Sequence, residues 1–118
     1  MGDEELVLRM NSDSFQREVI RSKGPFVFAV VAPWCPTSKL LESVLEQVAA
    51  REAGKVLVGR MDISEDPFFV ERSGNNTIPT LSLYLNEEEK SCFIGERSER
   101  NILLWIHECC NGGAHGKS

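Results

Sequence analysis

An unbroken apolar run that ends shortly before a cysteine constrains the fold more than any other part of the chain. Residues Phe26–Val31 are all apolar, and most are β-branched or aromatic. A strand that is apolar on both faces is typical of the centre of a sheet that helices cover on both sides. Cys35 and Pro36 follow, and apolar residues then recur at helical spacing until Gly54. The sequence therefore predicts a buried strand that leads through Cys35 into a long helix.

The rest of the chain alternates between strand and helix patterns. Further strands are predicted at residues 6–10, 55–62, 80–85 and 90–94, the last two joined by a turn at 86–89. Further helices are predicted to be capped by Asp13 (with Gln16), by Asp66 (ending at Val70) and by Ser98. The candidate buried positions on the helices are Phe15, Val19, Ile20, Leu40, Leu41, Val44, Leu45, Val48, Ile102, Leu103, Trp105 and Ile106. Alternation followed by a hairpin predicts an α/β fold, a mixed sheet of about five strands flanked by about four helices.

The size and charge of the chain limit its class. With 118 residues, of which 42% are hydrophobic, it can bury the core of one domain. We expect this domain at residues 1–110, followed by a flexible polar tail at 111–118. The net charge of −5 argues against nucleic acid or an anionic membrane as the main partner. No apolar stretch is long enough to span a membrane, and the acidic start lacks the apolar core of a secretion signal, so a cytoplasmic protein is predicted.

The cysteines number four and stand at positions 35, 92, 109 and 110. Cys109 and Cys110 are adjacent, so in one helix their side chains point in different directions, which argues against a disulfide framework. Without a secretion signal, reduced thiols are the better interpretation. These two cysteines and the nearby His107 also lack the paired spacing of structural zinc ligands, so no metal site is expected.

The position of Cys35 at the start of a helix gives its thiol a chemical role. The free backbone N–H groups and the dipole of a helix start stabilise a thiolate, and Lys39 adds positive charge. Pro36 suits the first helical turn because its missing N–H costs nothing there. A pKa near 7 would raise the thiolate fraction at neutral pH from about 3% to about half, yet speed attack only about threefold. Such a thiol suits reversible exchange; the alternative is a buried cysteine that serves as a small apolar residue.

Two motifs resemble those of the thioredoxin family. The stretch Trp34–Lys39, which reads Trp-Cys-Pro-Thr-Ser-Lys, resembles the family's active-site segment Trp-Cys-x-x-Cys-Lys. The stretch Thr77–Thr80, which reads Thr-Ile-Pro-Thr, resembles its cis-proline loop, and Gly95 falls where the family has glycine. The resemblance covers about residues 6–110 and implies the thioredoxin fold.

The resemblance also implies a substrate-binding surface around the thiol. It implies that Pro79 is cis and packs beside Cys35, whereas the residues alone leave open a trans proline that begins a strand. Ile78 and Pro79 are expected to hold an extended substrate segment through their backbone. The expected substrate-binding residues are Trp34, Pro36, Thr37, Ile78 and Pro79. For Trp34, ordinary packing is the alternative to a place on the rim of the site.

The chain departs from the family pattern at two positions. Ser38 stands where the family has its second motif cysteine, which resolves the mixed disulfide formed by the first. A hydroxyl cannot perform that step, although it can donate a hydrogen bond to the Cys35 thiolate. Ala29 stands where the family often has a buried acid that serves the resolving cysteine. Arg60 is interpreted as a solvated strand end rather than as part of the site.

These observations favour a monothiol thiol–disulfide exchange protein in which Cys35 is the nucleophile and Ser38 tunes it. Its expected partners are protein disulfides or thiols, with glutathione as a candidate second thiol, and no cofactor is expected. One alternative is a redox-inactive interaction or chaperone-type module that keeps only the fold. Another is a dithiol thioredoxin in which Ser38 is an engineered replacement for cysteine. The sequence defines neither the oligomeric state nor the electron donor.

Overall fold

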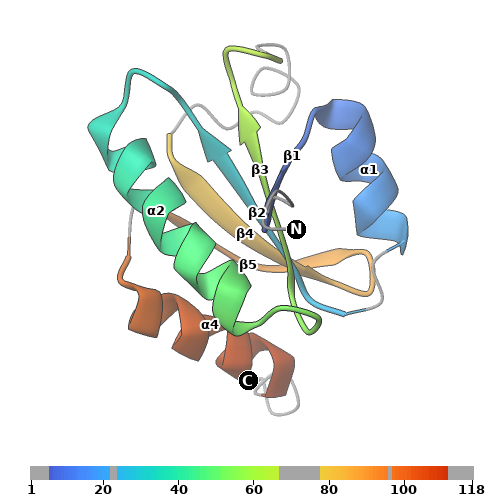
Figure 1. Cartoon of the computed structure of the whole chain (residues 1–118). Coiled ribbons are helices and arrows are strands. Elements are labelled where there is room, and N and C mark those ends of the chain that lie inside the picture. Colours follow the sequence, from blue (N-terminus) through green and yellow to red (C-terminus); the bar gives the residue numbers. More distant parts are fainter. Residues whose placement is uncertain (1–5, 22–23, 67–77, 96, 112–118) are drawn as a thin grey trace.

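The computed structural model describes residues 6–21, 24–66, 78–95 and 97–111. Their strands are β1 (Val7–Arg9), β2 (Phe26–Val31), β3 (Leu57–Asp62), β4 (Thr80–Leu85) and β5 (Glu88–Ile94). Their helices are α1 (Ser12–Arg21), α2 (Pro36–Arg51) and α4 (Glu99–Asn111). The strands form one sheet in the order β1-β3-β2-β4-β5, with α2 and α4 on one face and α1 on the other (Figure 1).

Strand β2 is the centre of the sheet, as its unbroken apolar run predicts. It pairs in parallel with β3 and antiparallel with β4, so Ala29 lies between Arg60 and Leu81. All six of its residues are buried. The mixed α/β sheet of five strands is therefore confirmed.

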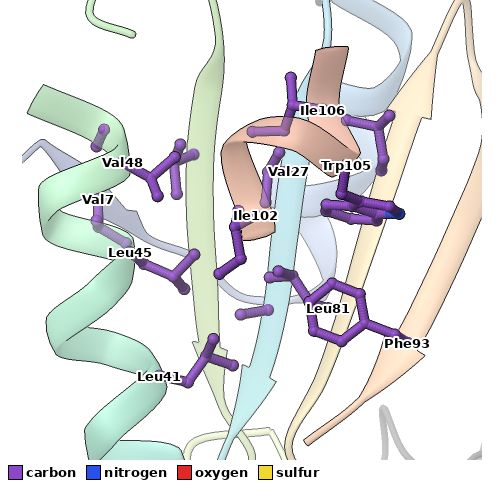
Figure 2. Packing of buried hydrophobic residues seen from close by; sticks show 14 of the residues in the cluster. Val7, Val27, Leu41, Leu45, Val48, Leu81, Phe93, Ile102, Trp105 and Ile106 are labelled. Carbon is purple, nitrogen blue, oxygen red and sulfur yellow. The ribbon is translucent and has the colours of Figure 1, made fainter. Parts of the chain in front are cut away.

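The side chains on the two faces of β2 belong to two separate hydrophobic clusters. Val27, Ala29 and Val31 point toward α2 and α4. Figure 2 shows their side of the sheet packed by residues of both helices, among them Leu41, Leu45 and Ile102. The opposite face of β2 packs against α1 through an aromatic cluster made of Phe15, Phe26, Phe28 and Tyr84. Burial on both faces fixes β2 rigidly, and the loop after it carries Cys35.

Helix α1 begins two residues before the predicted start, because its cap is Asn11 rather than Asp13. The N–H of Ser14 donates to Oδ1 of Asn11 at 2.9 Å, and the N–H of Asn11 donates to Oγ of Ser14 at 2.9 Å. This reciprocal pair is a capping box, in which the side chains satisfy donors that the helix leaves free. The capping box expected from Asp13 and Gln16 is therefore wrong, because both residues lie inside α1.

The hairpin between β4 and β5 is tighter than expected. Its turn is Asn86 and Glu87, with φ angles of 55° and 70°, so β5 begins at Glu88 and not at Lys90. Positive φ at both central residues matches the right-handed twist of the strands, which allows a two-residue connection. Asn86 tolerates this conformation readily because its short side chain can bond locally.

Two of the candidate buried positions on the helices are exposed in the structure. Leu40 is 58% exposed and Ile20 is 64% exposed, although both carry apolar side chains at helical spacing. The sheet covers only the narrow stripe of α2 that contains Leu41, Leu45 and Val48, and Leu40 lies beside that stripe. The N-cap at Ser98 is confirmed, since its Oγ accepts a hydrogen bond from the N–H of Asn101 at 3.1 Å. The short helix expected after Asp66 lies outside the described residues, which contain three helices.

Candidate active site around Cys35

Cys35 occupies the N-cap position of α2 in an extended conformation (φ −105°, ψ 114°). Its carbonyl oxygen accepts the N–H of Lys39 at 3.3 Å, and its own N–H donates to the carbonyl of Ala32 at 3.2 Å. Pro36 is at the first helical position, where no N–H is needed. The thiol is therefore held at the open end of a helix and is neither fully buried nor fully exposed.

Ser38 follows Cys35 in the first turn of α2 and is fully buried. Its hydroxyl oxygen accepts a hydrogen bond from the backbone N–H of Ala32 at 3.2 Å, so its hydroxyl hydrogen is available for another acceptor. Hydrogen bonding from the Ser38 side chain also lowers the pKa of the Cys35 thiol. Ser38 thus links the end of β2 to the first turn of α2.

Hydrogen bonds lower the pKa of the Cys35 thiol from its ordinary value. The backbone N–H of Ser38 contributes most and the Ser38 hydroxyl comes second, while partial burial opposes them and Thr37 adds smaller contributions. All these donors belong to the first turn of the helix, where N–H groups have no internal partner. The causes of this lower pKa are neutral donors of Ser38 and Thr37, and the expected contribution of Lys39 stays a prediction.

The loop that contains Ile78 and Pro79 leads into β4 at the same end of the sheet from which the chain continues to Cys35. Thr80, the first residue of β4, is in register with Val30 near the end of β2, and the two strands are antiparallel. The Ile78–Pro79 peptide bond is cis, and Pro79 is buried while Ile78 is half-buried. The N–H of Gly95, after β5, donates to the carbonyl of Pro79 at 2.8 Å. Thr77 lies outside the described residues.

Trp34 is 69% exposed, so it belongs to the surface beside Cys35 rather than to the core. Pro36 is exposed as well, and Thr37 is half-buried. The structure therefore places the accessible side chains of Trp34 and Pro36 beside Cys35 in the chain.

An ion pair lies on the α2 side of the sheet, where sequence reasoning did not anticipate one. Arg60 is in register with Ala29, and its Nε lies 3.7 Å from Oε1 of Glu42 on α2. The Arg60 side chain is 22% exposed, so its interpretation as a solvated strand end is wrong. Glu42 was missed, although it follows Ser38 by four residues and so lies on the same face of α2.

The other cysteines lie away from Cys35. Cys92 is on β5, in register with Ser82, and is exposed. Cys109 and Cys110 are in the last turns of α4, which Figure 1 shows at the opposite end of the fold from the start of α2. Burial raises the pKa of both Cys109 and Cys110, opposite to the shift of Cys35. All four cysteines are free thiols, and residues 6–21, 24–66, 78–95 and 97–111 contain no group of three or more potential metal ligands.

The sheet order, the helices on its two faces and a thiol at the start of α2 define an α/β protein of the thioredoxin fold. A chloroplastic thioredoxin z has the same fold, with a TM-score of 0.80 and 21% sequence identity over 87% of this chain and 93% of that one. The thioredoxin family model matches residues 6–108, and the chain belongs to this family.

Bacterial thioredoxins are similar to the chain over most of its length. The thioredoxin of Rickettsia felis is 32% identical over 99 residues, which are 84% of this chain and 94% of that protein. The thioredoxin of Rickettsia conorii is 34% identical over 95 residues, which are 80% of this chain and 90% of that protein. The family relationship supports a thiol–disulfide oxidoreductase. Within the described part of the chain, no helix has the length and apolar character needed to cross a membrane.

Proposed function

We propose that the protein is a monothiol thiol–disulfide exchange catalyst that works through Cys35 and uses glutathione as its second thiol. The observation that carries this proposal is the environment of Cys35, an accessible thiol at a helix start whose pKa is lowered by the Ser38 N–H and hydroxyl. A thiolate that is stabilised by hydrogen bonds is both available for attack and a good leaving group. A single thiol with these two properties can enter and leave a mixed disulfide.

The first step is capture. The Cys35 thiolate attacks the glutathione sulfur of a glutathionylated protein, the protein–glutathione S–S bond breaks, and the protein leaves as a thiolate that takes a proton from water. Cys35 then carries glutathione in a mixed disulfide. Ser38 donates its hydroxyl hydrogen to the Cys35 sulfur before attack, which stabilises the thiolate.

The second step is release. A glutathione thiolate attacks the glutathione sulfur bound to Cys35, glutathione disulfide forms, and Cys35 leaves as a thiolate. Ser38 takes no part as a nucleophile because a hydroxyl does not resolve a disulfide. In the net reaction, a protein–glutathione mixed disulfide and one glutathione thiol give a protein thiol and glutathione disulfide. One S–S bond breaks and one forms in each step, so the cycle is balanced.

The proposed substrate contacts are Trp34, Pro36, Thr37, Ile78 and Pro79. The exposed apolar side chain of Trp34 is suited to contact a protein substrate. The backbone of the Ile78–Pro79 loop lies at the end of the sheet at which β2 leads to Cys35. We place the domain at residues 1–110 and its setting in the cytoplasm, where the glutathione pool keeps thiols reduced.

The test is a deglutathionylation assay with a glutathionylated cysteine peptide, excess glutathione and coupled reduction of glutathione disulfide. We expect the unmodified protein to accelerate release, Cys35→Ser to abolish the acceleration, and the exposed-cysteine control Cys92→Ser to retain it. An unmodified protein that is no faster than buffer would contradict the proposal. If a protein partner then bound Cys35→Ser as well as the unmodified chain, the redox-inactive interaction module would be favoured instead.

A second assay separates the proposal from the dithiol alternative. Insulin disulfide reduction requires both motif cysteines of a thioredoxin, so we expect the present chain to be inactive in it. Full activity in Ser38→Cys would support an interrupted dithiol site, whereas no gain in that variant would support a site adapted to one thiol. The missing acid at Ala29, which is fully buried, favours no gain.

A further inference from the structure

A cavity of about 450 Å³ lies between the end of α2 and the outer face of α4, well apart from the site described above. It is lined by Arg51, Glu99, Arg100, Leu103, Leu104 and His107. Arg51 is the last residue of α2 and Cys35 caps its first, so the 16 residues of the helix separate the two places. At 1.5 Å of rise per residue, this separation is roughly 24 Å.

Among the described residues, the charges around the cavity leave the side chain of Arg100 without an ion-pair partner. Arg51 is paired with Glu99 across the two helices. His107 faces Glu52 at 3.9 Å, at the end of α2. Arg100 is exposed, and its side chain makes no hydrogen bond or ion pair with any other residue in the described part of the chain. Its guanidinium therefore keeps its planar set of five donors, which matches the two oxygens of a carboxylate.

The floor of the cavity is apolar. Leu104 is 51% exposed, and Leu103 is half-buried where it packs against the core between the helices and the sheet. A single exposed leucine is ordinary on a protein surface. Here two leucines line the same cavity as Arg100, whose guanidinium has no ion-pair partner among the residues that the structure describes. The combination is complementary to an apolar group that carries a negative charge beside it.

We propose that this cavity is a docking site for an acidic, apolar segment of a protein partner. A large apolar side chain of the segment contacts Leu103 and Leu104, and a carboxylate next to it binds Arg100 in a bidentate manner. A protein segment fits better than a small molecule, because sites for small molecules enclose most of the ligand, whereas Arg100, Leu104 and His107 are exposed. A segment obtains the remaining contacts outside the cavity. The site is independent of the exchange chemistry of Cys35.

The test titrates the full chain with a labelled peptide, acetyl-Glu-Glu-Leu-Leu-Glu-Glu-amide, and follows amide chemical shifts. We expect shifts centred on residues 100–104 and a Kd of about 0.1–1 mM, as for one carboxylate and one apolar side chain. Arg100→Gln should weaken binding about tenfold, and Leu104→Asn several-fold. The matched controls Arg17→Gln and Ile20→Asn change an exposed arginine and an exposed apolar residue on α1, across the sheet, and should leave the Kd unchanged.

Three outcomes would overturn the proposal. The first is no binding of the acidic peptide, and the second is equal binding by Arg100→Gln or by a peptide with lysine in place of glutamate. The third is binding of decanoate at this site without binding of the peptide, which would indicate a small amphiphile as the ligand. Glutathione exchange through Cys35 should be the same in Arg100→Gln as in the unmodified chain. Failure of the docking proposal therefore leaves the proposed catalysis intact, and failure of the proposed catalysis leaves the docking proposal intact.

Discussion

The hydroxyl oxygen of Ser38 accepts a hydrogen bond from the N–H of Ala32 at 3.2 Å, across the loop that carries Cys35. The bond joins the end of the central strand to the first turn of α2, and Ser38 is fully buried. In the proposed exchange cycle, Ser38 organises the loop and stabilises the thiolate at the position where a dithiol thioredoxin has its resolving cysteine. Its proposed part is that of a positioning residue rather than a nucleophile.

Removing that hydroxyl should affect both reactivity and stability. In Ser38→Ala, Cys35 loses a donor, so we expect its pKa to rise and its alkylation by iodoacetamide at neutral pH to slow. The buried N–H of Ala32 loses its acceptor, which should lower the free energy of unfolding by about 1–3 kcal/mol. Urea unfolding and the pH profile of alkylation measure the two effects. The control is Ser43→Ala, which changes an exposed serine of the same helix and should alter neither property. An unaltered alkylation profile in Ser38→Ala would contradict the role of the hydroxyl.

The lowered pKa of Cys35 makes stability depend on pH in a defined direction. Because the folded state holds the thiolate more strongly than the unfolded state, this contribution is fully present above the ordinary thiol pKa of about 8.5. It is lost as the pH falls through the lowered pKa of the folded state. We therefore expect the stability of the unmodified chain relative to Cys35→Ser to increase as the pH rises through the lowered pKa toward the ordinary thiol value. Urea unfolding of both proteins at a series of pH values tests this, and a difference that stays flat or decreases would contradict it.

Tyr84 should resist ionisation while the protein is folded. Burial, with smaller contributions from Glu89 and Cys92, raises its pKa to about 12. Its contribution to stability is present below the ordinary tyrosine pKa of about 10 and is lost as the pH rises toward that higher value. It is the single tyrosine of the chain, so tyrosinate absorbance reports on it alone. We expect no tyrosinate signal near pH 10 while circular dichroism shows the native fold. A half-ionised tyrosine under those conditions would refute the expectation. The Tyr84→Phe variant provides the absorbance baseline.

Two adjacent leucines of α2 should differ sharply in their importance for stability. Leu41 is fully buried against the sheet, whereas Leu40 is 58% exposed. We expect Leu41→Ala to cost about 2–5 kcal/mol of unfolding free energy, because it removes apolar contacts and leaves a cavity. Leu40→Ala should change it by less than about 0.5 kcal/mol. Thermal and urea unfolding compare the two variants, and similar losses in both would show that the register of the helix is wrong.

The chemistry of the site could be predicted from the sequence because it depends on local order. A buried strand, a cysteine, a proline and a helix follow one another along the chain, and adjacency alone places Cys35 at the helix start. The replacement of the resolving cysteine by Ser38 could be read in the same way. The source of the lowered pKa could not, because Lys39 and the N–H groups of the first turn are equally close in sequence, and the pKa of Cys35 is lowered mainly by hydrogen bonding from Ser38.

The sequence by itself determined the central strand at residues 26–31, the thiol at the start of α2 and the overall α/β order, since hydrophobic periodicity and helix-capping chemistry act over a few neighbouring residues. Only the tertiary structure decided that Leu40 is exposed while Leu41 is buried, and that Arg60 pairs with Glu42 beside Ala29. It alone brought Arg51, at the end of α2, to the same cavity as Arg100 and Leu104 of α4. The physical reason is that burial and charge pairing depend on which strand or helix lies opposite a residue, and that neighbour is set by the packing of segments far apart in the chain.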